Sequence, residues 1–192
     1  MVRAKAKHVG PVLALLAALA GGCVAGNPGA SAGLDAGADA ADAAPDFFIA
    51  FASTFQTFRT WPSFPSPGPT DDGTFPPDVL GPRTQYVNRV PPHGATEFPI
   101  GTVIVEARES GAKKIFAAVK RGRDFNRTGA RNWEWFELAE SPDRVLIVWR
   151  GVGPPTNDSY GGDPNGGCNS CHAKCGATND FICSSALQLS RF

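Results

Sequence analysis

The sequence predicts an α+β domain that is mainly β: an antiparallel sheet with an N-terminal helix and a C-terminal segment carrying a cysteine–histidine motif. Three observations lead to this fold class. Short runs rich in β-branched and aromatic residues follow one another with brief turns between them, as in an antiparallel sheet. Before these runs, phenylalanines recur every three or four residues, as on one face of a helix. After them, the stretch CNSCH at 168–172 holds two of the five cysteines.

The first 22 residues have the pattern of a lipoprotein-type signal peptide. The basic start MVRAKAK precedes the short apolar run PVLALLAALA, which small residues then end. This run is too short to cross a membrane as a helix. Cys23 is the expected lipidated residue, and the alternative is plain secretion with an incidental cysteine. We therefore expect an exported, periplasmic protein attached to a membrane only by N-terminal lipid. Val24, where aspartate would be a retention signal, favours the outer membrane.

Residues 23–45 are expected to form a flexible tether. They consist mostly of Ala, Gly, Asp, Ser and Pro, which cannot bury enough apolar surface to offset the entropy of ordering. Residues 46–192 then form one domain of ordinary size. Loss of residues 1–22 removes three basic and no acidic side chains, which leaves 15 Lys and Arg against 18 Asp and Glu. Without a basic stripe, we expect no nucleic acid as a partner.

Within the domain, the helix is expected over residues 46–61. The phenylalanines that share its predicted face are Phe47, Phe48, Phe51, Phe55 and Phe58. Residues 62–78 contain too many prolines for a helix or a central strand and are predicted to form an extended loop. The strands expected after this loop lie at 84–90, 101–107, 114–121, 132–139 and 144–150.

The motif around Cys168, Cys171 and His172 can be a redox dithiol, a metal site or a haem attachment site. A thioredoxin-type dithiol opens a helix after a strand, whereas a Gly- and Pro-rich loop precedes this motif. A zinc or iron–sulfur site would also need Cys175 and Cys183, but the spacing fits no common pattern and leaves the histidine without a role. Haem attachment uses both thiols, one for each vinyl group, and makes His172 the iron ligand. The sequence therefore predicts one covalently bound haem c.

The remaining cysteines agree with this assignment. Cys23 is assigned to lipid and two cysteines to haem, so Cys175 and Cys183 are left as a pair. In an oxidising compartment we expect them to form a disulfide, and the alternative is two free buried thiols.

The sixth position of the iron is expected to be open. Met1 is the only methionine and leaves with the signal peptide, so a methionine ligand is excluded. His93 is the only other histidine outside the signal peptide, and it lies in a Pro-rich loop where an exposed side chain is the ordinary expectation. The alternative is a bis-histidine electron carrier that uses His93. An open iron binds small molecules.

Several segments together resemble the cytochrome P-460 family, which includes the cytochromes c′-beta. They are RTQYVN (83–88), FPIGTVIVE (98–106), AAVKRG (117–122), NWEWFEL (132–138), CNSCH (168–172) and TNDFI (178–182). The resemblance covers about residues 47–192. It implies a mostly antiparallel β fold, a monohaem c-type centre with an open distal face and, usually, a homodimer. It also implies hydroxylamine oxidation or nitric oxide binding, with a redox partner protein as a further expectation.

The resemblance also implies roles for individual residues. It makes Arg83 a residue of the haem pocket. Glu106 stands where the P-460 enzymes have a lysine cross-linked to the porphyrin, and Phe116 stands where they have a carboxylate over the iron. Without that cross-link and that base, the altered haem electronics and the proton acceptor are lost. Glu106 could itself present a carboxylate to the pocket.

We therefore expect Phe116 on the distal wall, with Arg83 and Glu106 as pocket or catalytic residues. An apolar wall suits a neutral ligand, which favours nitric oxide binding, with or without electron transfer, over hydroxylamine oxidation. Whether the protein is an enzyme stays open. If it is, a haem oxidoreductase acting on hydroxylamine or nitric oxide is expected.

Overall fold

The computed structural model describes residues 45–68, 80–108, 114–152 and 167–192. The predicted signal peptide and Cys23 lie outside these residues, as does the predicted tether except for its last residue, Pro45. Within the described ranges, no helix combines the length and apolar character needed to cross a membrane.

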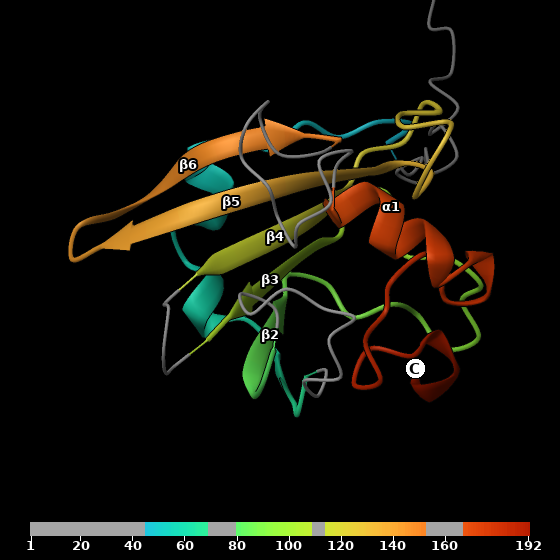
Figure 1. The fold of residues 1–192 in the computed structure, drawn as a ribbon, viewed down its shortest axis with the longest axis horizontal. Helices are drawn as coiled ribbons and strands as arrows, with labels where there is room; N and C mark the ends of the chain where they lie inside the picture. The colour runs from blue at the N-terminus through green and yellow to red at the C-terminus, as the bar shows by residue number, and fades with distance from the viewer. Residues whose placement is uncertain (1–44, 69–79, 109–113, 153–166) are drawn as a thin grey trace, which may run out of the picture. The chain divides into compact units, whose positions relative to one another are not determined.

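Six strands form one antiparallel sheet in which every strand pairs with the next one along the chain (Figure 1). The strands are β1 (Ser63–Ser66), β2 (Arg83–Val87), β3 (Val103–Ala107), β4 (Ile115–Lys120), β5 (Trp133–Ser141) and β6 (Arg144–Gly151). All five predicted strands are confirmed as β2 to β6, with ends that differ by at most three residues. The predicted antiparallel, mainly β architecture is therefore confirmed.

The first strand is a feature that the prediction of an extended loop missed. β1 lies at the edge of the sheet and pairs with β2, with Pro65 opposite Thr84. A proline has no N–H to donate to a neighbouring strand. A central strand pairs on both sides and loses a hydrogen bond there, whereas an edge strand can turn this position toward solvent. The proline count correctly excluded a central strand there and could not exclude an edge strand. Residues 69–78 of the predicted loop lie outside the described part of the chain.

The predicted N-terminal helix over residues 46–61 is wrong. The chain there forms two short 3₁₀-helices, η1 (Ala52–Phe55) and η2 (Phe58–Thr60). Between them Thr57 leaves helical geometry, with φ −112° and ψ 15°. Serine and threonine residues fill this stretch, and their hydroxyls compete for backbone groups, as when Thr60 Oγ1 donates to the Thr57 carbonyl at 2.8 Å.

The phenylalanines predicted to share one helix face differ in burial. Phe55, at the end of η1, and Phe58, at the start of η2, are both buried. Phe47 is 42% and Phe51 63% exposed. Only part of the predicted apolar face therefore enters the core.

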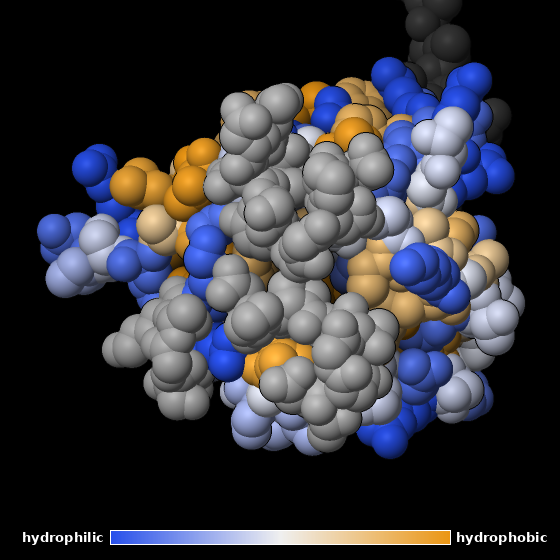
Figure 2. Space-filling model, viewed as in Figure 1, coloured by the Kyte–Doolittle hydropathy of each residue, from blue (hydrophilic) through white to orange (hydrophobic). Residues whose placement is uncertain are grey.

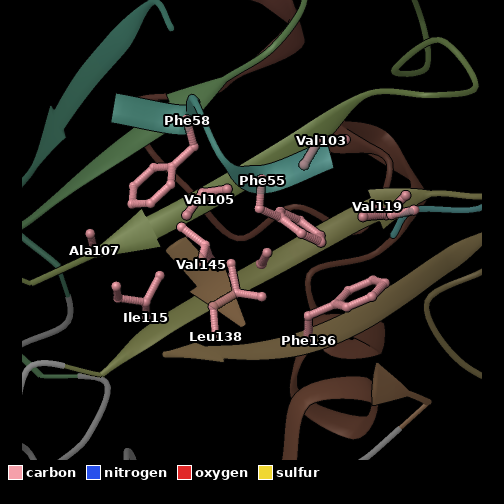
Figure 3. Packing of buried hydrophobic residues seen from close by; sticks show 12 residues of the cluster. Phe55, Phe58, Val103, Val105, Ala107, Ile115, Val119, Phe136, Leu138 and Val145 are labelled. Carbon is pink, nitrogen blue, oxygen red and sulfur yellow. The ribbon is translucent and has the colours of Figure 1, made fainter. Parts of the chain in front are cut away.

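The two faces of the sheet carry separate hydrophobic clusters. On one face, Phe55 and Phe58 pack against strand residues to form the first cluster (Figure 3). Its main strand residues are Val103, Val105, Ala107, Ile115, Ala117, Val119, Phe136, Leu138 and Val145. The N-terminal segment therefore covers this face of the sheet.

The opposite face carries the second cluster, which the C-terminal segment covers. That segment contains α1 (Gly167–Lys174), η4 (Ala177–Asn179) and η5 (Leu189–Arg191), coloured orange to red in Figure 1. The buried members of the second cluster are Val87, Phe98, Ile104, Ala118, Ala130, Trp133, Trp135, Trp149, Ile182, Leu187 and Leu189. The predicted cysteine–histidine motif is thus carried by the layer that lies on this face.

A β-bulge between β5 and β6 changes which side chains reach the second cluster. The pairing steps from Glu137 opposite Trp149 to Leu138 opposite Ile147, so Val148 is the extra residue. Such a bulge changes the face of the sheet on which the side chains beyond it lie. As a result, Trp149 belongs to the second cluster. β6 is also an edge strand, and Leu146 and Val148 are exposed there, where Figure 2 shows a hydrophobic area.

Candidate functional site

Helix α1 brings together the three residues of the predicted attachment motif. Cys168, Cys171 and His172 are spaced i, i+3 and i+4, which places them on one face of a helix. Cys168 packs against the second cluster, and both thiols are half-buried and free. The motif therefore faces the sheet.

The side chain of His172 is fixed by neighbours on both the sheet and the C-terminal segment. Its Nδ1 lies 2.7 Å from the main-chain oxygen of Phe181, which can only accept a hydrogen bond, so Nδ1 carries the proton. Its ring packs on the indole of Trp135, with the ring centres 4.1 Å apart. Burial lowers the pKa of His172, against the opposing effects of the Phe181 carbonyl and Glu106. The imidazole is thus neutral at pH 7, and Nε2 keeps its lone pair.

The thiols do not have the character of a redox dithiol. Burial, then the neighbouring Cys171, and further Glu137 and Glu106 raise the pKa of Cys168 to about 12, against a main-chain hydrogen bond that lowers it. Burial also raises the pKa of Cys171, although Lys174 opposes it. Catalytic dithiols need a lowered pKa, because the thiolate is the nucleophile. Both sulfurs are therefore protonated thiols at neutral pH.

Asn169, between the two motif cysteines, links α1 to the loop before β5 by hydrogen bonds. Its Oδ1 accepts hydrogen bonds from Asn126 Nδ2 at 2.5 Å and from the Ala130 amide at 2.9 Å. A Cβ on Gly129 would collide with the Asn169 side chain. The residue inside the motif therefore has a structural role that the motif pattern itself does not reveal.

The close contact between Gly129 and Asn169 gives a prediction for Gly129→Ala. The added methyl group displaces the Asn169 amide, and loss of its hydrogen bonds should lower the free energy of unfolding by about 1–3 kcal/mol. Denaturant unfolding of the purified protein measures this change. In a background of Asn169→Ala the methyl group meets no amide, so the same substitution should cost less there. Equal costs in the two backgrounds would contradict the contact.

Arg83 and Glu106, both predicted pocket residues, form an ion pair on the same face as the motif. Arg83 Nη1 donates to Glu106 Oε1, and Gln85 Nε2 donates to Glu106 Oε2 at 3.0 Å. Ser184 of the C-terminal segment donates to Gln85 Oε1. Both carboxylate oxygens are therefore engaged, and the network joins the segment after α1 to β2 and β3.

Phe116 packs against the second cluster and lies between two carboxylates in the sheet register. The sheet register aligns Glu106 with Phe116, and Phe116 with Glu137 on the next strand. Glu137 is 13% exposed and accepts hydrogen bonds from Lys114 Nζ at 3.1 Å and from Trp149 Nε1 at 3.0 Å. The apolar distal wall near Phe116 stays a prediction, and each carboxylate that flanks Phe116 is matched by a cation, Arg83 or Lys114.

His93 lies beside the end of the C-terminal segment, away from the motif in α1. Its Nδ1 is 2.8 Å from the main-chain oxygen of Phe192, and the two residues line an open groove with Thr96 and Ser190. The lining residues of this groove include none of the motif residues. The structure thus associates His93 with the C-terminal residue.

Cys175 and Cys183 form a disulfide, with their Cα atoms 5.4 Å apart. Its Cys183 sulfur lies 3.6 Å from His172 Nδ1, so the bridge adjoins the motif histidine. The alternative of a four-cysteine metal site needs both of these sulfurs as thiolates, and a disulfide removes them. Among the described residues, no group of three or more His, Cys, Asp or Glu side chains is arranged to hold a metal ion.

Two buried donors of this face have no hydrogen-bond partner among the described residues. They are Nε1 of Trp135, whose ring contacts His172, and Nη2 of Arg83. Buried polar atoms are nearly always paired, so unpaired donors beside a motif point to a further group at the site. A haem fits this place, because its propionates are hydrogen-bond acceptors and His172 Nε2 is left free to bind iron.

Comparison of the chain with models of protein families, with curated proteins and with solved structures finds no match. The site is therefore described by its own geometry.

Sequence reasoning missed several residues of the site. Glu137 could have been found, because it lies two residues after Trp135 in a predicted strand and so shares its face. Trp149 could not, because its orientation depends on the bulge. The pairing of His172 with the Phe181 carbonyl also has no sequence signal.

Proposed function

We propose that this chain is an exported, c-type monohaem protein of the cytochrome P-460 type that binds a small ligand such as nitric oxide. The observation that carries the proposal is the state of His172. Its Nδ1–H donates a hydrogen bond to the Phe181 main-chain carbonyl, and its ring packs on Trp135. Iron-binding histidines are typically held in this way, with the other nitrogen left for the metal. The resemblance to the P-460 family supports the same conclusion.

The two free thiols account for attachment. Cys168 and Cys171 would each hold the haem by a thioether bond, formed by addition of the S–H to a vinyl group so that sulfur bonds one carbon and hydrogen the other. This addition needs no oxidant or reductant. The disulfide already uses Cys175 and Cys183, so only Cys168 and Cys171 are available among the described cysteines. Haem c supplies an iron that binds small ligands at its open position.

The charges near Phe116 favour ligand binding over hydroxylamine oxidation. A base that takes protons from hydroxylamine needs a free carboxylate oxygen within reach. Both oxygens of Glu106 accept hydrogen bonds from Arg83 and Gln85, and both oxygens of Glu137 from Lys114 and Trp149. These partners occupy the carboxylate oxygens that would have to reach the substrate. Hydroxylamine oxidation is the second candidate, since two carboxylates flank Phe116.

The proposal is tested by the absorption spectrum of the holoprotein with and without nitric oxide. An open iron should be high-spin in the ferric state, and its ferrous spectrum should change on addition of nitric oxide. Turnover of hydroxylamine with an electron acceptor would favour the second candidate. A spectrum that nitric oxide leaves unchanged would contradict an open site.

His93→Ala should leave the ferric spectrum unchanged. The reason is that His93 contacts Phe192 and lines a groove that excludes the motif residues. The measurement is the spin state of the purified ferric protein, with the Thr96→Ala variant of the same groove as a control. A low-spin protein that becomes high-spin only in His93→Ala would instead support the bis-histidine carrier.

Export and assembly belong to the same proposal. A signal peptide over residues 1–22 and lipid on Cys23 would hold the domain at the outer membrane on the periplasmic side. The exposed Leu146 and Val148 on the edge strand β6 are compatible with a homodimer or a redox partner protein, since unpaired apolar edges tend to be covered.

A further inference from the structure

A buried ion pair joins β4 to Asp180, the residue before Phe181, whose carbonyl contacts His172. Lys120, at the end of β4, is 2% exposed, and Asp180, after η4, is 3% exposed. The Lys120 ammonium lies 2.5 and 2.6 Å from the two carboxylate oxygens of Asp180. Burying two charges is costly, and replacing such a pair with apolar residues is often neutral or stabilising. The pair therefore calls for a role other than stability.

Further contacts fix the position of Asp180. Its Oδ2 accepts a hydrogen bond from the Phe98 amide at 3.0 Å, and its main-chain oxygen accepts one from Trp133 Nε1 at 2.7 Å. Lys120 also lies 3.5 Å from Glu97 and over the Trp133 ring at 5.4 Å. The side chain and the backbone of Asp180 are thus both attached to the sheet.

The backbone at this point is strained. Asp180 has φ +49° and Phe181 has φ +64°, so two consecutive residues other than glycine adopt the left-handed conformation. This conformation is unfavourable for residues other than glycine and persists only where its surroundings hold it. The turn directs the Phe181 carbonyl to His172 Nδ1 at 2.7 Å. The residue that follows Asp180 along the chain is therefore the one whose carbonyl holds His172.

We propose that the Lys120–Asp180 ion pair is a positioning device that sets the strength of the hydrogen bond from His172 to Phe181 and, through it, the properties of the iron. This inference rests on the proposed haem function. A strong hydrogen bond from Nδ1 makes the imidazole a more basic ligand, which stabilises the ferric over the ferrous iron. Lys120 and Asp180 act only through the turn, so they are positioning residues.

The test compares two variants with a matched control. Asp180→Asn keeps the shape of the side chain and a residue that tolerates the left-handed conformation. Lys120→Met/Asp180→Asn removes both charges, so no unpaired charge is left buried and the variant is expected to fold. Val103→Ala makes a cavity in the first cluster, on the opposite face of the sheet. All are measured as holoproteins.

The readouts are the iron–histidine stretching band in the resonance Raman spectrum of the ferrous protein and the reduction potential. Both ion-pair variants should lower the frequency of the band and shift the potential to more positive values, while Val103→Ala should leave both unchanged. A band that stays at the wild-type frequency in both ion-pair variants overturns the inference. An equal shift in Val103→Ala does so too, because the effect would then be general destabilisation. Wild-type protein without any haem would instead refute the proposed function itself.

Discussion

The variant Cys168→Ala/Cys171→Ala should carry no covalently bound haem. Both thiols lie on one face of α1, are free and are protonated, so each is available to add to a vinyl group. Without them no thioether can form, and the loss should be complete. The measurement is haem staining of the protein after denaturing electrophoresis, following expression in a host that matures c-type cytochromes. Each single variant should keep one thioether at most and show weaker attachment.

The matched control is Cys175→Ala/Cys183→Ala. It also removes two cysteines from the C-terminal segment, but these form the disulfide. This variant should be less stable and still carry haem, because its two attachment thiols are intact. Haem retained by the Cys168→Ala/Cys171→Ala variant under denaturing conditions would show that other residues form the covalent link.

Phe55→Ala should lower the free energy of unfolding by about 3–5 kcal/mol, the usual cost of removing a fully buried phenylalanine. Phe55 has no exposed surface, and its ring lies 5.3 Å from that of Phe136 in the first cluster. A small alanine would leave a cavity between η1 and the sheet. Denaturant unfolding of the holoprotein, followed by tryptophan fluorescence, measures the change.

The control for this prediction is Phe51→Ala, a second phenylalanine of the same segment. It is 63% exposed, so its truncation should change the free energy of unfolding by about 0.5 kcal/mol or less. A continuous helix with both phenylalanines on its buried face would instead make the two losses similar. Similar losses in Phe51→Ala and Phe55→Ala would therefore contradict the 3₁₀ arrangement.

The strands could be predicted because their signal is local. Short β-branched and aromatic runs between turn residues gave β2 to β6 and the antiparallel order. The N-terminal segment could not be predicted in this way, since phenylalanines three apart suit both an α-helix and a 3₁₀-helix. The spacing of Phe55 and Phe58 alone does not distinguish them, and it carries no sign of the break at Thr57 between η1 and η2.

Residue spacing predicted the site only where its residues are close in the sequence, whereas Arg83 and Glu106 were expected from the family resemblance. The spacing of Cys168, Cys171 and His172 predicted that they act together, and α1 places them on one face. The groups that hold the histidine depend on tertiary structure, because Trp135 comes from β5 and Phe181 from a left-handed turn. No local pattern indicates that Lys120, sixty residues earlier than Asp180, fixes that turn.

The most direct test of the account is the intact mass of the wild-type protein under denaturing conditions, after maturation in a host that attaches haem c. We predict the mass of the processed polypeptide plus one haem, with a pyridine haemochrome spectrum typical of two thioether links. A colourless protein with the mass of the polypeptide alone would contradict the central claim that Cys168, Cys171 and His172 hold a haem.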